Sequence, residues 1–141
     1  MSLQVDTTVT TSTGRRYYFQ PDHRNGNPKK SQWSIGLPEE LHCFENSVNL
    51  GWANSSHAWG LHCPGAIPEV LGHSPTGLSL KIAKFVAGTS TSFWHGYPAN
   101  YRQYHQDRPP VSILRGWESC GLIKKYEVAR VRGGKPCSLS D

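Results

Sequence analysis

The sequence lacks several features that would place it in a familiar class. No hydrophobic run approaches the length of a membrane-spanning helix, and the N-terminus has no apolar signal-peptide segment. The motifs C-x-x-C, H-E-x-x-H and G-x-S-x-G and the glycine-rich phosphate loops are also missing. These absences argue against a zinc ribbon, a thioredoxin-like site, a hydrolase nucleophile elbow and a P-loop. We therefore expect a cytoplasmic protein with no membrane association and no cofactor.

The composition predicts one domain that is rich in turns. The chain has 141 residues, of which 36% are hydrophobic and 18% are charged, and it contains 14 glycines and 10 prolines. This length supports a single core, and the composition is typical of a folded chain. Residues 1–14 are rich in Thr and Ser and are expected to form a flexible tail or an edge strand. Residues 15–141 are expected to form a single α+β domain.

Charge is distributed unevenly along the chain. The net charge is +5, with five basic and six acidic residues in the first 70 positions and ten basic and four acidic residues in the rest. An excess of cations confined to one half favours an anionic partner such as nucleic acid.

The four cysteines form no framework. They are Cys43, Cys63, Cys120 and Cys137, and none lies at metal-ligand or redox spacing from another. Without a secretory signal, we expect them to be reduced thiols that pack mostly as small hydrophobic side chains.

Turn residues and hydrophobic periodicity predict the elements. Aromatic and β-branched runs indicate strands at residues 16–20, 31–35, 57–63, 78–87 and 92–97, with the second strand pairing with the first. Pro38 is expected to open a helix that runs to about Val48. Two further helices are expected at residues 111–120, ending at Gly121, and at residues 124–132. The fold class is therefore α+β: a mostly antiparallel sheet, one helix from the N-terminal half and a C-terminal helical hairpin.

The strands at residues 78–87 and 92–97 are predicted to form a hairpin with a loop at residues 88–91. In the first strand, alternation suggests that Leu78, Leu80 and Ile82 are buried. Ser79, Lys81 and Ala83 should then face solvent. In residues 93–101, four aromatic side chains and a histidine surround a glycine and a proline that we expect to force a turn.

The C-terminal helices resemble a helix-turn-helix in outline only. Trp117 occupies a position that requires a small residue, and Glu127 and Arg130 fall where apolar residues belong, so major-groove binding is disfavoured. We expect instead a helical hairpin packed on the sheet, with cations left in solvent. The packing residues are expected to be Leu114, Trp117, Leu122 and Ala129, and the solvated cations Lys124, Lys125, Arg130 and Arg132.

The leading functional hypothesis is that the aromatic hairpin binds RNA or other single strands. Exposed aromatic rings stack on bases, and neighbouring cations neutralise phosphates. The candidate residues are Trp94, Tyr97, Tyr101, Lys84, Arg102 and Arg108. Alternation places Phe93 and His95 on one face of the strand and Trp94 on the other, so at most part of the cluster is exposed. The competing interpretation is that these aromatics only build the core.

A metal-independent RNase is the first alternative. Two histidines can serve as acid and base beside a ribose 2′-hydroxyl, with a cation stabilising the phosphorane. His95 paired with His57 or His62 would supply the catalytic groups. His105 is a further titrating group.

Three further alternatives stay open. Trp and Tyr side chains could anchor a protein partner. A zinc site could draw on His57, His62 and Cys63 together with His42 and Cys43, although no ligand spacing supports it, and we expect no metal. A thiol enzyme could combine Cys63, His95 and Asp107. The sequence does not decide among these, nor does it indicate an oligomeric state.

Overall fold

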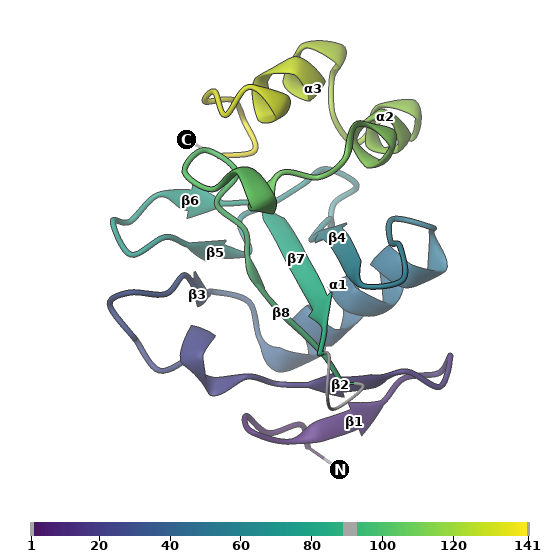
Figure 1. Ribbon diagram of the computed structural model, residues 1–141, viewed down its shortest axis with the longest axis vertical. Helices are drawn as coiled ribbons and strands as arrows, with labels where there is room; N and C mark the ends of the chain where they lie inside the picture. Colours follow the sequence, from purple (N-terminus) through teal and green to yellow (C-terminus); the bar gives the residue numbers. More distant parts are fainter. Residues whose placement is uncertain (1, 89–92, 141) are drawn as a thin grey trace.

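The computed structural model describes residues 2–88 and 93–140 and confirms the predicted α+β class (Figure 1). Three α-helices flank strands that form mostly antiparallel pairs. The strands are β1 (Thr8–Thr10), β2 (Arg16–Tyr18), β3 (Gln32–Trp33), β4 (His57–Leu61), β5 (Gly72–His73), β6 (Ser79–Leu80), β7 (Ile82–Ala87) and β8 (Phe93–Pro98). The helices are α1 (Leu37–Asn49), α2 (Val111–Ser119) and α3 (Lys125–Arg132), with 3₁₀ turns η1 (Pro21–His23) and η2 (His105–Asp107). None of the helices in these ranges is long and apolar enough to cross a membrane.

Five strands form the main sheet in the order β1-β2-β8-β7-β4, and β3, β5 and β6 form a smaller sheet. The hairpin prediction is confirmed, since β7 and β8 pair antiparallel. Apart from Gly88, its expected loop at residues 88–91 lies outside the described residues. The N-terminal strand β2 pairs parallel with β8, so the N-terminal segment extends the sheet beside the hairpin.

The predicted pairing of the second strand with the first is wrong. β3 pairs with β5 in the small sheet rather than with β2. The predicted long strand at residues 78–87 is likewise two strands, because β6 pairs with β5 whereas β7 pairs with β4. The change of sheet occurs at Lys81, whose backbone N–H donates to the carbonyl of Leu139 at 3.2 Å.

The main sheet is buried on both faces at its centre. On one face, α1 packs against the strands, with the rings of Phe44 and Phe85 in edge contact at 5.3 Å (Figure 1). On the other face, α2 and α3 cover one end, where Trp117 packs with Ile82 and Leu61. The prediction that Ala83 faces solvent is therefore wrong, because α1 covers its side of β7.

Gly96 and Pro98 lie within β8 and do not make the expected turn. A Cβ at Gly96 would overlap the ring of Phe85, so this glycine lets the ring close over the strand. The aromatic segment is therefore an extended strand as far as Pro98.

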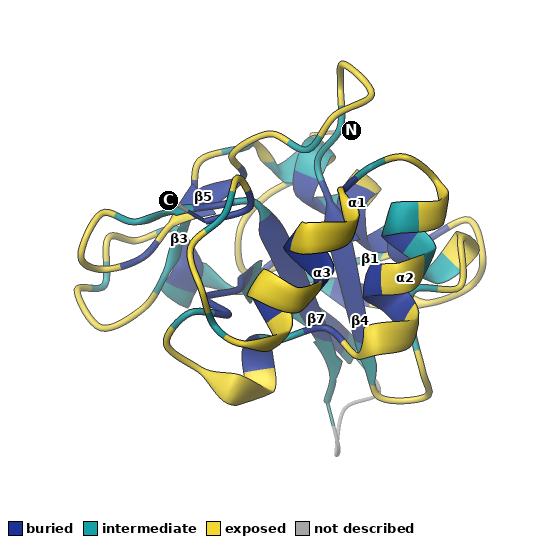
Figure 2. Cartoon of the chain, turned by 90° about the horizontal axis from the view of Figure 1, so that it is seen from above, coloured by how far each residue is buried: buried dark blue, intermediate teal, exposed yellow. Residues whose placement is uncertain are grey.

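The helical hairpin at the C-terminus packs as predicted in most positions. Leu114 and Trp117 are buried, and Gly121 ends α2 with a φ of 77°, a conformation that favours glycine. In α3 the buried residues are Glu127, Val128 and Val131, whereas the expected Ala129 is exposed. The four cations expected in solvent are exposed, and Figure 2 shows the outer faces of both helices as exposed surface.

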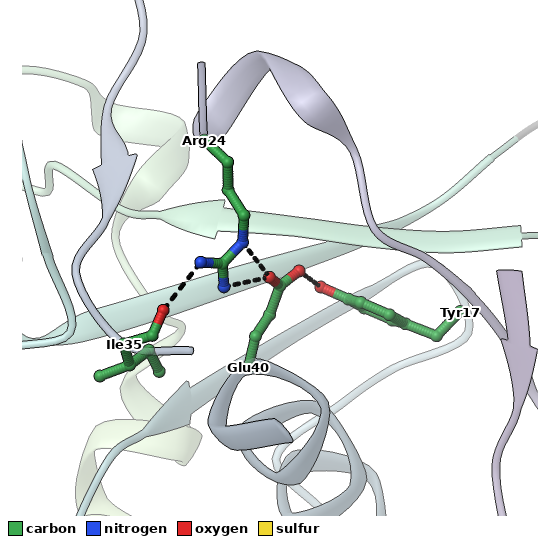
Figure 3. A network of polar contacts seen from close by, with 4 residues as sticks. All are labelled: Tyr17, Arg24, Ile35 and Glu40. Carbon is green, nitrogen blue, oxygen red and sulfur yellow. Dashed lines mark hydrogen bonds and ion pairs between the residues drawn. The ribbon is translucent and has the colours of Figure 1, made fainter. Parts of the chain in front are cut away.

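A buried ion pair joins Arg24, the residue after η1, to Glu40 of α1 (Figure 3). Glu40 is 1% exposed, and its two oxygens accept from Arg24 Nη2 at 2.7 Å and from the Tyr17 hydroxyl at 2.5 Å. Arg24 Nη1 also donates to the carbonyl of Ile35 at 2.8 Å. Burial raises the pKa of Glu40, while the hydrogen bonds from Tyr17 and Arg24 oppose that shift.

We expect Glu40→Gln to lower the free energy of unfolding by about 3 kcal/mol. This value is at the low end of the free-energy cost of breaking a buried ion pair. We expect the low end because the Arg24 side chain keeps 15% of its surface exposed, so water can solvate its charge after the pair is broken. Urea denaturation measures the change. The matched control is Glu118→Gln, which removes the exposed pair with Arg115 and should cost less than about 0.5 kcal/mol. Equal decreases in the two variants would contradict the role given to Glu40.

Candidate functional site

The register of three strands brings two of the predicted histidines onto one face of the main sheet. Val86 of β7 pairs with His57 of β4 on one side and with His95 of β8 on the other. Paired residues in neighbouring strands point to the same face. His57 and His95 therefore flank Val86 in one row, on the face that α1 does not cover.

The predicted stacking residues have different environments. Trp94 points to the opposite face from His95, is 8% exposed and packs against Phe44 with ring centroids 5.4 Å apart. Tyr101 is fully buried, and its hydroxyl donates to the carbonyl of Lys135 at 2.9 Å. Of the three, Tyr97 is the one that lines a cavity. Trp94 and Tyr101 are core residues in this structure.

The predicted phosphate-binding cations are held by the protein itself. Lys84 is 5% exposed, and its Nζ donates to the carbonyl of Gln106 at 2.5 Å and lies over the ring of Trp59. Burial lowers the pKa of Lys84. Arg108 donates to the backbone carbonyls of Tyr101 and Arg132. These side chains fasten loops to the sheet.

Arg102, the third predicted cation, is half-buried in the loop that follows β8. Its side chain does not line the cavity described next.

A cavity of about 330 Å³ lies beside β8 on the face that carries His95. Its floor is formed by His95 and Tyr97. Its walls come from segments distant in sequence: η1 with the residue before it, the loop at residues 29–31, the turn at residues 74–75 and the loop at residues 100–107. This volume lies at the lower end of the range of small-molecule sites.

His23 is fixed in the wall of this cavity. Its ring stacks on Tyr97 with centroids 5.3 Å apart and planes at 19°. Its Nδ1 lies 2.9 Å from the carbonyl oxygen of Ser31, which can only accept a hydrogen bond. Nδ1 therefore carries the proton of the neutral ring and Nε2 keeps a lone pair. Burial lowers the pKa of His23, while the hydrogen bond to Ser31 acts in the opposite direction and the charges of Lys30 and His95 add to the effect of burial.

Two buried polar atoms at the cavity have no hydrogen-bond partner among the described residues. They are Nδ1 of His95 and Oε1 of Gln20, and both residues line the cavity. Buried polar atoms are usually paired, so each such atom calls for an explanation, of which a missing ligand is one. Burial also lowers the pKa of His95.

The floor of the cavity is held in place by one carboxylate. Asp107 accepts from the Tyr97 hydroxyl at 2.7 Å and from the backbone N–H of Asn100 at 2.9 Å. Burial and the Asp107 charge raise the pKa of Tyr97, so its hydroxyl stays protonated and keeps donating. The loop that contains η2 is thereby fastened to β8.

The rim of the cavity is cationic and aromatic. Lys29 and Lys30 line it and are exposed, and neither ammonium group has an ion-pair partner among the described residues. Tyr104 also lines it and is 44% exposed, which makes it the most accessible ring at the site. The arrangement suits an anionic ligand that carries a planar group.

The other candidate groups do not converge here. His57 shares the sheet face but lies outside the cavity, stacked on Trp59, and His62 follows β4 and also lies outside it. Of the thiol set, Asp107 and His95 line the cavity, whereas Cys63 packs against the core near α2. In the described part of the chain, no group of three or more His, Cys, Asp or Glu side chains could hold a metal ion.

Much of the basic excess in the second half of the chain lies on the helical pair. Arg115, Lys125 and Arg132 surround the exposed ring of Tyr126 in a groove between α2 and α3. This groove is a second cationic surface, and two of its cations, Lys125 and Arg132, are among those that the sequence analysis expected to be solvated.

No protein family model, curated protein or solved structure matches this chain. Its functional interpretation therefore depends on the geometry of the site.

Sequence reasoning missed Gln20, His23, Lys29, Lys30 and Tyr104. The first four lie in and around a segment that its turn residues identify as a loop, in the half of the chain without a basic excess. The available signal was local, since residues 15–30 combine five cations with His23 and only one acidic residue. Their convergence with β8 comes from the pairing of β2 with β8.

We expect His23 and His95 to titrate below pH 6.5, because burial penalises their charged forms. The folded state then binds fewer protons than the unfolded chain. Their contribution to stability is complete above pH 6.5 and is lost as the pH falls, by up to about 1.4 kcal/mol per pH unit for each histidine. NMR titration of the ring protons, assigned with His23→Gln and His95→Gln, measures both values. A titration at or above pH 6.5 would contradict the burial described.

Proposed function

We propose that this protein binds single-stranded nucleic acid, with one nucleotide seated in the cavity beside β8. The observation that carries the proposal is the pair of buried, unpartnered atoms, Gln20 Oε1 and His95 Nδ1, at the same cavity. Oε1 accepts hydrogen bonds only, so it requires an N–H or O–H donor, and a nucleobase or a ribose supplies both kinds.

The charge and shape of the rim support the same ligand class. Lys29 and Lys30 can each neutralise a phosphate on the strand, and Tyr104 offers a face to a base. A single strand is favoured over a duplex because an unstacked nucleotide can enter a cavity of about 330 Å³, whereas a paired base cannot without leaving its helix.

In this proposal the interface differs from the one expected from sequence. Trp94 and Tyr101 support the strand and the loop from inside the core, and Lys84 and Arg108 hold the loops. The groove that contains Tyr126, Arg115 and Arg132 is available for phosphates further along the strand. The proposal places the protein in the cytoplasm, since its four cysteines are free thiols, as is usual in a reducing compartment.

We expect Lys29→Gln/Lys30→Gln to weaken binding of a labelled single-stranded oligonucleotide and to make it less sensitive to salt. The slope of log K against log salt concentration should fall by about 1.4, at roughly 0.7 for each phosphate that is no longer neutralised by a lysine. Fluorescence anisotropy at several salt concentrations measures the slope.

The matched control is Lys124→Gln/Arg130→Gln, which removes the same charge at exposed positions outside both the cavity and the groove that contains Tyr126. If both double variants lower the slope equally, binding is not centred on the cavity. If the wild type does not bind, or binds without any dependence on salt, the proposal fails and a protein partner becomes the better hypothesis.

We expect Tyr104→Ala to weaken binding by about 1–3 kcal/mol, because the base no longer has a ring to stack on. The side chain is exposed and its removal leaves the core intact, so the variant should melt like the wild type. Trp94→Ala is unsuitable for this purpose, because emptying a buried aromatic site costs about 3–5 kcal/mol of stability. Unchanged affinity in Tyr104→Ala would remove the stacking interaction from the proposal.

A further inference from the structure

Two imidazoles reach the same cavity from different parts of the fold. His23 comes from η1 in the wall and His95 from β8 in the floor. His95 lies two residues before Tyr97 in the same strand, and His23 stacks on Tyr97. The two histidines are close enough for the charge of His95 to lower the pKa of His23. This pair differs from the pairs that the sequence suggested, which joined His95 to His57 or His62.

The two rings are held differently. His23 is fixed by its stacking on Tyr97 and by its Nδ1–H donated to Ser31, which leaves the lone pair of Nε2 as its basic site. His95 is half-buried, and its Nδ1 has no partner in the described residues. One histidine is thus preset as a proton acceptor, whereas the other lines the cavity with no hydrogen bond that fixes its Nδ1 among the described residues.

We propose that the cavity cleaves RNA, with His23 as the general base and His95 as the general acid. Nε2 of His23 takes the proton of a ribose 2′-hydroxyl, and the 2′-oxygen attacks the adjacent phosphorus. As the new O2′–P bond forms, the bond from phosphorus to the 5′-oxygen of the next nucleotide breaks. His95 donates its proton to that oxygen. The products are a 2′,3′-cyclic phosphate and a 5′-hydroxyl, and no metal or further reactant is consumed.

The surroundings of the pair suit this step. Lys29 and Lys30 at the rim can stabilise the charge on the pentacoordinate phosphorus, and a bound phosphate favours the protonated form of His95. Gln20 Oε1 can accept from the base or ribose of the seated nucleotide. The inference rests on the proposed function, because cleavage requires a strand bound in the cavity.

The test uses the full chain and three labelled strands of one sequence, in EDTA: RNA, RNA with one 2′-deoxy position, and fully 2′-O-methylated RNA. Cleavage is followed on gels and the termini by mass spectrometry. Binding is measured on the 2′-O-methylated strand, which has no 2′-hydroxyl proton to lose. Wild type, His23→Gln and His95→Gln are purified in parallel, with His62→Gln as the matched control outside the cavity.

We expect the wild type and His62→Gln to produce 2′,3′-cyclic phosphate ends and to spare the bond after the 2′-deoxy position. His23→Gln and His95→Gln should each lose about 100-fold or more of the cleavage rate while still binding the 2′-O-methylated strand. The 2′-deoxy substrate tests the chemistry without altering the protein. Where His23→Gln fails to fold, the comparison of wild type with His95→Gln assigns the cleavage to this protein.

Other outcomes overturn the inference. Cleavage that is equal in wild type and both histidine variants comes from a contaminating nuclease. Binding of the 2′-O-methylated strand without cleavage of RNA removes the inference but leaves the proposed function standing. Absence of both binding and cleavage contradicts the inference and the proposed function together.

Discussion

The buried ion pair between Glu40 and Arg24 is the interaction on which the candidate site depends. A carboxylate that is 1% exposed is tolerated here because Arg24 and the Tyr17 hydroxyl both donate to it. Arg24 directly follows His23, so the pair that joins α1 to the loop after η1 also holds the wall of the cavity against its floor. The stacking of His23 on Tyr97 and the hydrogen bonds from His23 to Ser31 and from Gln32 to Asp22 hold η1 in the same place.

The second constraint is that different elements cover the two faces of the main sheet. One face is sealed by α1, and the other is sealed at one end by α2 and α3 and further along by the loop that contains η2. Two hydrogen bonds join that loop to the sheet: Lys84 of β7 donates to the carbonyl of Gln106, and Tyr97 of β8 donates to the carboxylate of Asp107. The part of β8 left uncovered is the part that carries His95 and Tyr97.

Local structure could be predicted from the sequence, and most of the site could not. The helix after Pro38 and the two C-terminal helices follow from periodicity and capping residues, and the hairpin follows from alternation. The exposure of Trp94 depends on where α1 packs, and the break at Lys81 depends on a backbone bond to Leu139. His23 reaches His95 through a parallel pairing of strands distant in sequence. Contacts of this kind leave no period or motif in a single sequence.

The pairing of β2 with β8 also has a consequence for the order in which the molecule assembles. The wall and the floor of the cavity are separated by about 70 residues of chain, so closing this loop is among the costlier steps in folding. During synthesis, η1 emerges first and must wait unpaired until β8 has left the ribosome. Helix α1, which contains Glu40, is available much sooner, and Glu40 can hold η1 through Arg24 in the meantime. A nascent chain therefore carries His23 for some time before His95 has been added and the cavity can form.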